Sequence, residues 1–66
     1  MSVMKVIEIM GCSSTGWEDA TKKAVATASK SIKGIKSAWV KDQSVTIKNG
    51  VVKEFRVTLK LTFAVK

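Results

Sequence analysis

The 66-residue chain contains no histidine, proline or tyrosine, and it has one cysteine and one arginine. The single cysteine, Cys12, excludes an internal disulfide. Five acidic residues without any histidine are a poor ligand set for a metal cluster. A nucleophile paired with a base, a pair of acids at a plausible catalytic spacing and a phosphate-binding loop are also missing. We therefore expect a protein that is not an enzyme and that has no metal-ligand set of its own.

Long apolar runs are missing as well. The most apolar stretch near the start, residues 3–10, is interrupted by Lys5 and Glu8 and is too short to cross a bilayer. Neither a signal peptide nor a membrane-spanning segment is predicted. Because a free thiol is typical of a reducing compartment, the sequence indicates a cytoplasmic protein.

Apolar residues make up 45% of the chain, which reads as one small domain over residues 1–66. A domain of this size buries only about 60% of its unfolded surface and is marginally stable alone. Small domains usually add disulfides, a metal or partner subunits, and the composition leaves only the last of these. We therefore predict that copies of the chain associate with one another.

Positive charge dominates the sequence, with 12 Lys+Arg against 5 Asp+Glu, a net charge of +7 and a pI near 9.9. Such a balance suits an anionic partner, although it also fits a plain lysine-rich surface. A nucleic-acid-binding module needs a continuous basic patch with exposed aromatic residues, whereas these lysines are spread along the whole chain. A nucleic-acid partner is therefore the less favoured interpretation, and no membrane partner is expected.

The first half of the chain predicts a strand followed by a helix. Residues 3–11 are rich in β-branched and apolar side chains on both faces, which predicts a strand that ends at Gly11. Apolar residues then recur at nearly helical spacing over residues 17–32. Most of them are alanine, so this helix can approach a sheet closely.

The ends of this helix also carry signals. Thr15 and Glu18 have the spacing of a capping box, in which the threonine hydroxyl and the glutamate side chain bond backbone amides at the helix start. Gly34 stands where a C-terminal cap is expected, with lysines beside it that complement the helix dipole. The helix is thus predicted to end close to Gly34.

The second half predicts a hairpin of two strands. A strand over residues 37–48 is followed by Asn49 and Gly50, the strongest short signal for a type I′ turn. The last strand, residues 51–66, alternates most clearly, with polar residues on one face. Its other face is apolar: Phe55, Val57, Leu59, Leu61, Phe63 and Val65.

These elements give an α+β fold of order β-α-β-β. The compact arrangement is a three-stranded antiparallel sheet of order 1-3-2, with the helix packed on one face. One helix covers one face only. The opposite face needs another copy of the chain to cover it.

In this order the motifs resemble those of the dodecins. A short strand is followed by Gly11 and Ser13, and a helix opens with Trp-Glu-Asp-Ala at residues 17–20. A second strand carries Val40 with Asp-Gln at 42–43, and residues 55–63 follow the pattern aromatic-x-Val-x-Leu-x-Leu-x-Phe. The resemblance covers nearly the whole chain.

The resemblance implies a hollow spherical dodecamer built from trimers. Many dodecins bind flavins, stacked in pairs between tryptophans where subunits meet, and act as flavin stores or buffers. Members that lack this tryptophan are not flavin proteins, and some have been described with calcium. The present chain is closer to these members.

Four residues are the ligand-site candidates that this resemblance implies. An ungapped match from Gly11 puts Ser37 at the position of the stacking tryptophan, and Trp39 lies two residues further on, about 7 Å along the same strand face. Arg56 replaces the glutamine that bonds the flavin edge in the family. Gln43, which on simple alternation shares the face of Trp39 and Lys41, is the fourth candidate.

Each candidate also has a plain structural interpretation. Trp39 suits an interface anchor between subunits as well as a stacking plate, and Gln43 suits a backbone contact. Arg56 suits an ion pair with Glu54, Glu8 or Asp42.

The sequence therefore predicts a non-enzymatic, dodecin-like homododecameric shell that stores a small ligand at subunit contacts. A flavin such as riboflavin, FMN or FAD is the leading ligand. The alternative is a flavin-independent dodecin whose cavity holds another ligand, for example calcium or a phosphorylated cofactor.

Overall fold

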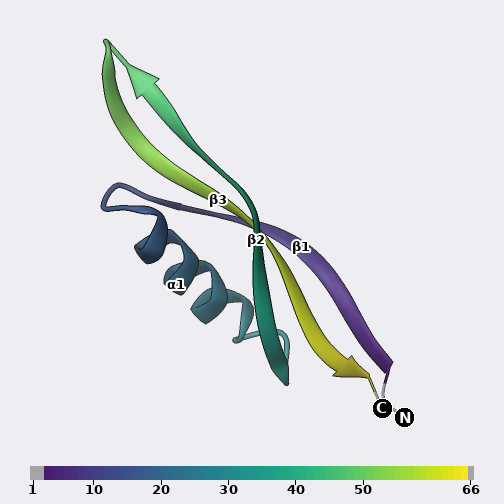
Figure 1. The fold of residues 1–66 in the computed structure, drawn as a ribbon. Coiled ribbons are helices and arrows are strands. Elements are labelled where there is room, and N and C mark those ends of the chain that lie inside the picture. Colours follow the sequence, from purple (N-terminus) through teal and green to yellow (C-terminus); the bar gives the residue numbers. More distant parts are fainter. Residues whose placement is uncertain (1–2, 66) are drawn as a thin grey trace.

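The computed structural model describes residues 3–65 and has the predicted element order (Figure 1). Strand β1 (Val3–Ser13) is followed by helix α1 (Trp17–Ala28), strand β2 (Ile35–Lys48) and strand β3 (Val51–Val65). The sheet order is β1-β3-β2, and both pairings are antiparallel, as predicted. Within residues 3–65, no helix has the length and hydropathy to cross a membrane.

Helix α1 packs on one face of the sheet, over β1 and β3 (Figure 1). The core consists of Ala20 from the helix and Val57, Leu59 and Leu61 from β3, all with 0% exposure. Their alternation confirms the predicted apolar face of the last strand. Toward the ends of β3 the cover is lost, because α1 is much shorter than the strands, and Val65 is exposed.

The two strands β2 and β3 extend together well beyond the helix, so the chain is elongated, with principal extents of 51 × 20 × 14 Å (Figure 1). Asn49 and Gly50 at the tip have φ of 53° and 75°, as the predicted type I′ turn requires. The tip carries exposed Ile47, Val51 and Val52, which no other element covers.

Strand β1 runs two residues past its predicted end. Gly11 does not terminate the strand; it lies inside it, buried beneath the helix. A Cβ built on Gly11 would lie 2.7 Å from both the Ala20 carbonyl oxygen and the Ala24 Cβ. The glycine is therefore required by the close approach of α1, for which the alanine stripe provides the other half.

The predicted capping box is wrong. The N-cap residue is Gly16, no side chain caps the helix, and Thr15 contributes its backbone amide instead. That amide donates to the Ser13 Oγ at 2.9 Å, and the Ser13 hydroxyl donates to the Asp19 Oδ2 at 2.6 Å. Buried Ser13 thus ties the end of β1 to the first turn of α1, and this replaces the expected local cap.

The helix ends at Ala28, several residues before the predicted end near Gly34. The segment after it carries serines, which compete with helical hydrogen bonding, and its amides form a short turn back onto Thr27 and Ala28. Gly34 has φ of 76° and does serve a turn, but one that leads the chain into β2. That strand starts at Ile35 and not at residue 37.

Three lysines interrupt the pairing of β2 with β3. The register shifts at Ile35/Ser37, Val40/Asp42 and Thr46/Ile47 leave Lys36, Lys41 and Lys53 without a cross-strand partner. Each shift is a β-bulge, which adds one residue to one strand and changes which side chains share a face. These bulges decide the composition of the candidate site.

Candidate ligand-binding face

The sheet face opposite α1, called here the open face, has no covering element among residues 3–65. Its central column on β3 is the polar side of that strand: Arg56, Thr58, Lys60 and Thr62. Cross-strand pairing then adds residues of β1 on one side and of β2 on the other. The sequence-predicted candidates can be placed by this register.

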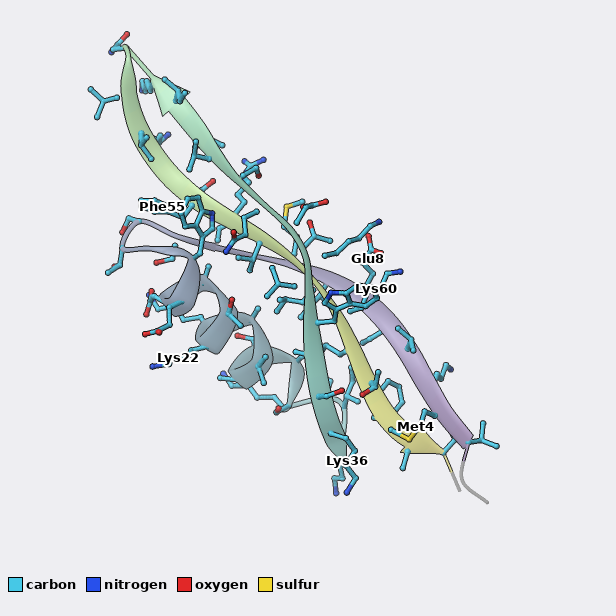
Figure 2. All side chains as sticks on the ribbon, viewed as in Figure 1. Met4, Glu8, Lys22, Lys36, Phe55 and Lys60 are labelled. Atoms are coloured by element: carbon cyan, nitrogen blue, oxygen red, sulfur yellow. The ribbon has the colours of Figure 1, made fainter. Side chains whose placement is uncertain are left out.

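Trp39 lies in the middle row of the open face. It pairs with Lys60, which in turn pairs with Glu8 on β1. The indole is 68% exposed, and the Lys60 Nζ lies 5.7 Å from its ring centroid. Such a cation–π contact occupies one side of the ring. Figure 2 shows Glu8 and Lys60 close together on the side of the sheet away from the helix.

Lys41, the extra residue of a bulge in β2, contributes a second ammonium group to this row. The Lys41 Nζ lies 3.4 Å from the Glu8 Oε1, so a residue of one edge strand contacts a residue of the other, across β3. Both side chains are about half exposed. Two lysines, one carboxylate and one indole thus form a cluster with a surplus positive charge. We call Trp39, Lys41, Lys60 and Glu8 the Trp39 cluster.

Ser37 lies one row along from Trp39 on the same face, as expected. Its hydroxyl is hydrogen-bonded to the Thr62 hydroxyl, its cross-strand partner. Beside them on β1 is Val6, which is 54% exposed. The position that the resemblance assigns to a stacking ring therefore holds a small polar pair, and Trp39 is the aromatic surface on this face.

Arg56 also lies on the open face, two rows from Trp39. Its Nε is 3.1 Å from the Glu54 Oε1, an ion pair with a neighbour on the same strand. Glu54 was one of the three acids considered for it, and the other two, Glu8 and Asp42, are not its partners in the structure. The guanidinium is 42% exposed and keeps further donors available.

Gln43 does not share the face of Trp39, contrary to the alternation argument. It pairs with Val57, whose side chain is in the core, whereas Trp39 pairs with Lys60 on the opposite side of β3. The bulge at Lys41 lies between them and inverts the alternation. The structure therefore separates Gln43 from the other three candidates.

Trp17 has a structural role. Its Nε1 donates to the Ser44 carbonyl oxygen at 3.1 Å, and its ring meets Phe55 edge-on, with centroids 5.1 Å apart. Both contacts lie on the helix side of the sheet. They tie the first turn of α1 to β2 and β3, so this tryptophan is not part of the open face.

An apolar groove of about 320 Å³ runs between the edge of β1 and α1. Ile9, Met10, Ala24 and Ala28 line it, together with the exposed thiol of Cys12. Lys23 and Thr27 also line it, and the Lys23 ammonium is paired with Asp19. Within residues 3–65 there is also no group of three or more acidic, histidine or cysteine side chains able to hold a metal ion.

Two contacts of the site are not among the sequence-based predictions: the Trp39–Lys60 contact and the Ser37–Thr62 hydrogen bond. Counting outward from the Asn49–Gly50 turn pairs Trp39 with Lys60, since the turn fixes the register of a hairpin. This count is the signal in the sequence from which both contacts can be predicted. It succeeds because the bulges at Lys53 and Lys41 add one residue to each strand and cancel.

Comparison with known proteins identifies relatives over the full length. Residues 3–66 match the sequence model of the dodecin family. A calcium dodecin of Mycobacterium tuberculosis is 36% identical over 66 residues, covering all of this chain and 93% of that protein. A variant of the dodecin of Thermus thermophilus is 35% identical, with TM-score 0.93 over 100% of this chain and 97% of the other. The dodecin of Streptomyces coelicolor is 29% identical, with TM-score 0.94 over 98% and 93%.

Proposed function

Because the chain belongs to the dodecin family, we propose that it forms a hollow homododecamer, built from trimers, that stores a planar anionic ligand of the flavin class and catalyses no reaction. The observation that carries this proposal is the Trp39 cluster. It presents an exposed indole beside two ammonium groups on a sheet face that the described part of the chain leaves uncovered.

Self-association is supported by how little the single chain buries. Among residues 3–65, only four apolar residues are fully buried, whereas eleven large apolar side chains are exposed. They include Met4, Val6 and Met10 on the open side of β1 and Ile47 and Val51 at the hairpin tip. Exposed apolar surface on this scale marks protein contacts. Burying it between copies supplies the stability that one small core lacks.

The chemistry of the Trp39 cluster supports the ligand class. The free side of the Trp39 ring can stack on a flat ring system, an interaction worth about 1–3 kcal/mol per ring for nucleobases. Lys41 and Lys60 supply two ammonium groups beside the indole that can hold a phosphate attached to that ring system by charge-assisted hydrogen bonds. The arrangement therefore favours FMN over riboflavin.

The remaining candidates modify this site. Ser37 and Thr62 satisfy each other and leave space beside Trp39, while Arg56 has a carboxylate partner. Ligand stacking is accordingly assigned to Trp39 and not to the position of Ser37. A reducing cytoplasm is the compartment that we propose, and the exposed free thiol of Cys12 fits it.

The test is a fluorescence titration of FMN and riboflavin with protein whose mass is measured by light scattering. We expect a mass near twelve subunits and quenching of FMN that is lost in Trp39→Ala and largely kept in Trp39→Phe. Lys60→Gln should weaken FMN more than riboflavin. Quenching that is equal in wild type and Trp39→Ala, at unchanged mass, would remove Trp39 from the site.

A gain-of-function variant provides the converse test. Ser37→Trp with Arg56→Gln restores both residues that the flavin-binding pattern requires, and both positions lie on the open face. We expect it to bind riboflavin more tightly than the wild type does. An assembled variant with no gain would show that this part of the face is blocked by another element of the shell.

Calcium is the second candidate ligand, because the 36% identical relative is named a calcium dodecin. In this chain Asp42 lies on the open face and forms no ion pair with any residue in the range 3–65. A calcium ion needs six to eight oxygen ligands, so several copies would have to contribute Asp42. Calorimetric titration of wild type and Asp42→Asn with calcium tests this proposal, because the heat of calcium binding should be seen with the wild type and be absent with the variant.

A further inference from the structure

The positive charges of the chain divide into paired and unpaired groups. Four acids are engaged in ion pairs, by Lys22, Lys23, Lys41 and Arg56. Lys60 lies against Trp39. Among the remaining lysines of the described range, three lie within one short stretch of sequence: Lys30, Lys33 and Lys36. All three are exposed, and none forms an ion pair with residues 3–65.

These three lysines lie on the segment that connects α1 to β2, which we call the lysine turn (residues 29–36). The segment is held by backbone hydrogen bonds. The amides of Ser29, Lys30, Ser31 and Ile32 donate to carbonyl oxygens of the last helical turn, at 2.9 to 3.2 Å. Gly34, with φ of 76°, then reverses the chain into β2. Lys30 and Lys33 are thus carried by an ordered turn.

Lys36 completes the group at the start of β2. It is the unpaired residue of the bulge between Ile35 and Ser37, so the sheet does not engage it. Figure 2 shows Lys36 at the start of β2, at the tip of the sheet. Ile32 and Ile35, between the lysines, are partly buried and anchor the turn to the protein.

Charge along α1 is segregated. Glu18 and Asp19 occupy its first turn, where each pairs with a lysine four residues on. The lysine turn lies at the other end, about 18 Å away for a helix of this length. No acid occurs between residue 20 and residue 41. The positive field of the three lysines is therefore not cancelled by carboxylates of their own segment.

We propose that the lysine turn is a binding surface for the phosphate backbone of nucleic acids. The lysines are spread along the sequence, but the fold leaves three of them unpaired on one turn. Lysine is a compact charge that suits phosphates as point contacts. The turn has no arginine and no aromatic residue, so binding is independent of base sequence and strongly salt-dependent.

A lipid surface fits the turn less well. Membrane-binding segments combine basic residues with exposed large apolar side chains that enter the bilayer. Here the two isoleucines are turned into the protein and only lysines, serines and glycine are exposed. The proposal is independent of the ligand assigned to the Trp39 cluster, since the two surfaces share no residue.

The experiment compares two variants that lose the same net charge. One is Lys30→Gln/Lys33→Gln/Lys36→Gln. The matched control is Lys22→Gln/Lys48→Gln/Lys53→Gln, whose lysines are also exposed but lie on α1 and at the hairpin tip. Binding of a short fluorescent DNA duplex of random sequence is measured by anisotropy from about 50 to about 200 mM salt. Light scattering and circular dichroism on each sample verify assembly and fold.

If three phosphate contacts are made, raising the salt over that range should weaken DNA binding by the wild type about 40-fold. The turn variant should lose this share of the salt dependence, with the slope reduced by about 0.9 per lysine, while the control keeps it. An equal loss in both variants would mean a general effect of net charge and would overturn the proposal. So would an absence of DNA binding at about 50 mM salt, whether or not the protein co-sediments with anionic lipid vesicles.

Discussion

Replacement of Gly11 by alanine tests the contact on which the fold depends most directly. The new Cβ would lie 2.7 Å from the Ala20 carbonyl oxygen and 2.7 Å from the Ala24 Cβ. One of these atoms belongs to the backbone and the other to a side chain with no freedom to move away. The helix itself would therefore have to shift off β1, which would also loosen the packing of Ala20 on the core.

Overpacking of this kind destabilises proteins by about 1–3 kcal/mol. In a domain of 60 to 100 residues, each kcal/mol lowers the melting temperature by about 4–8 °C. We expect Gly11→Ala to melt about 4–24 °C below the wild type. The melts must be run at one protein concentration, because association between copies adds to the apparent stability.

Gly16→Ala is the matched control, because a Cβ there meets no atom within 4 Å and φ is extended at 165°. Its cost should stay below about 1 kcal/mol. A second check is the pair Gly11→Ala with Ala24→Gly, whose combined loss should be smaller than the sum of the single losses. If Gly11→Ala melts like the Gly16 control, the close approach of α1 to β1 does not exist in solution.

Two further changes probe the turn before α1 and the core. The hydrogen bond from Ser13, together with the Lys23 ammonium, lowers the pKa of Asp19 below the usual 3.8. The ionised Asp19 therefore stabilises the fold at neutral pH, and this stabilisation is lost as the pH falls through the lowered pKa. The wild type should lose more stability on acidification than Asp19→Asn does, and parallel pH profiles in urea melts would contradict this. Leu59→Ala removes a fully buried side chain and should cost about 2–5 kcal/mol in the same melts, against a far smaller loss for the exposed control Val52→Ala.

The fold follows from patterns that are local in sequence. Alternation along β3, helical spacing after residue 17 and the Asn49–Gly50 turn determine the element order and the sheet order. The predictions of the fold that are wrong concern the ends of the helix and the strands. The capping box of Thr15 and Glu18 is a valid local pattern, but the Thr15 amide that Glu18 would bond donates to the buried Ser13 hydroxyl oxygen instead. Such competition between a local bond and a bond brought by packing is not visible in the sequence.

The candidate site was only partly predictable, for a different reason. Ser37, Trp39 and Arg56 share the open face as alternation requires, whereas Gln43 does not. Gln43 is separated from the turn by the single bulge at Lys53, and Trp39 by the bulges at Lys53 and Lys41. One bulge moves the side chains that follow it to the opposite face of the sheet, and a second bulge returns them to the original face. Bulge positions follow from packing and twist of the sheet, so simple alternation could place Trp39 but not Gln43.

The geometry of Trp39 also links ligand binding to assembly. Lys60 already occupies one side of the indole, so a flat ligand on a single chain would be covered on one side only and would leave its other side in water. Within residues 3–65 the open face supplies no second aromatic ring, because Trp17 and Phe55 contact each other on the helix side and Phe63 has the strand parity of the core residues. If the chain stores a flat ligand at Trp39 as proposed, a second wall for that ligand has to come from another copy of the chain. The apolar side chains of β1 beside the cluster, Val6 and Met10, are the surface on which such a copy can pack. Under the proposed function, ligand affinity and subunit association are therefore expected to be thermodynamically coupled, each strengthening the other.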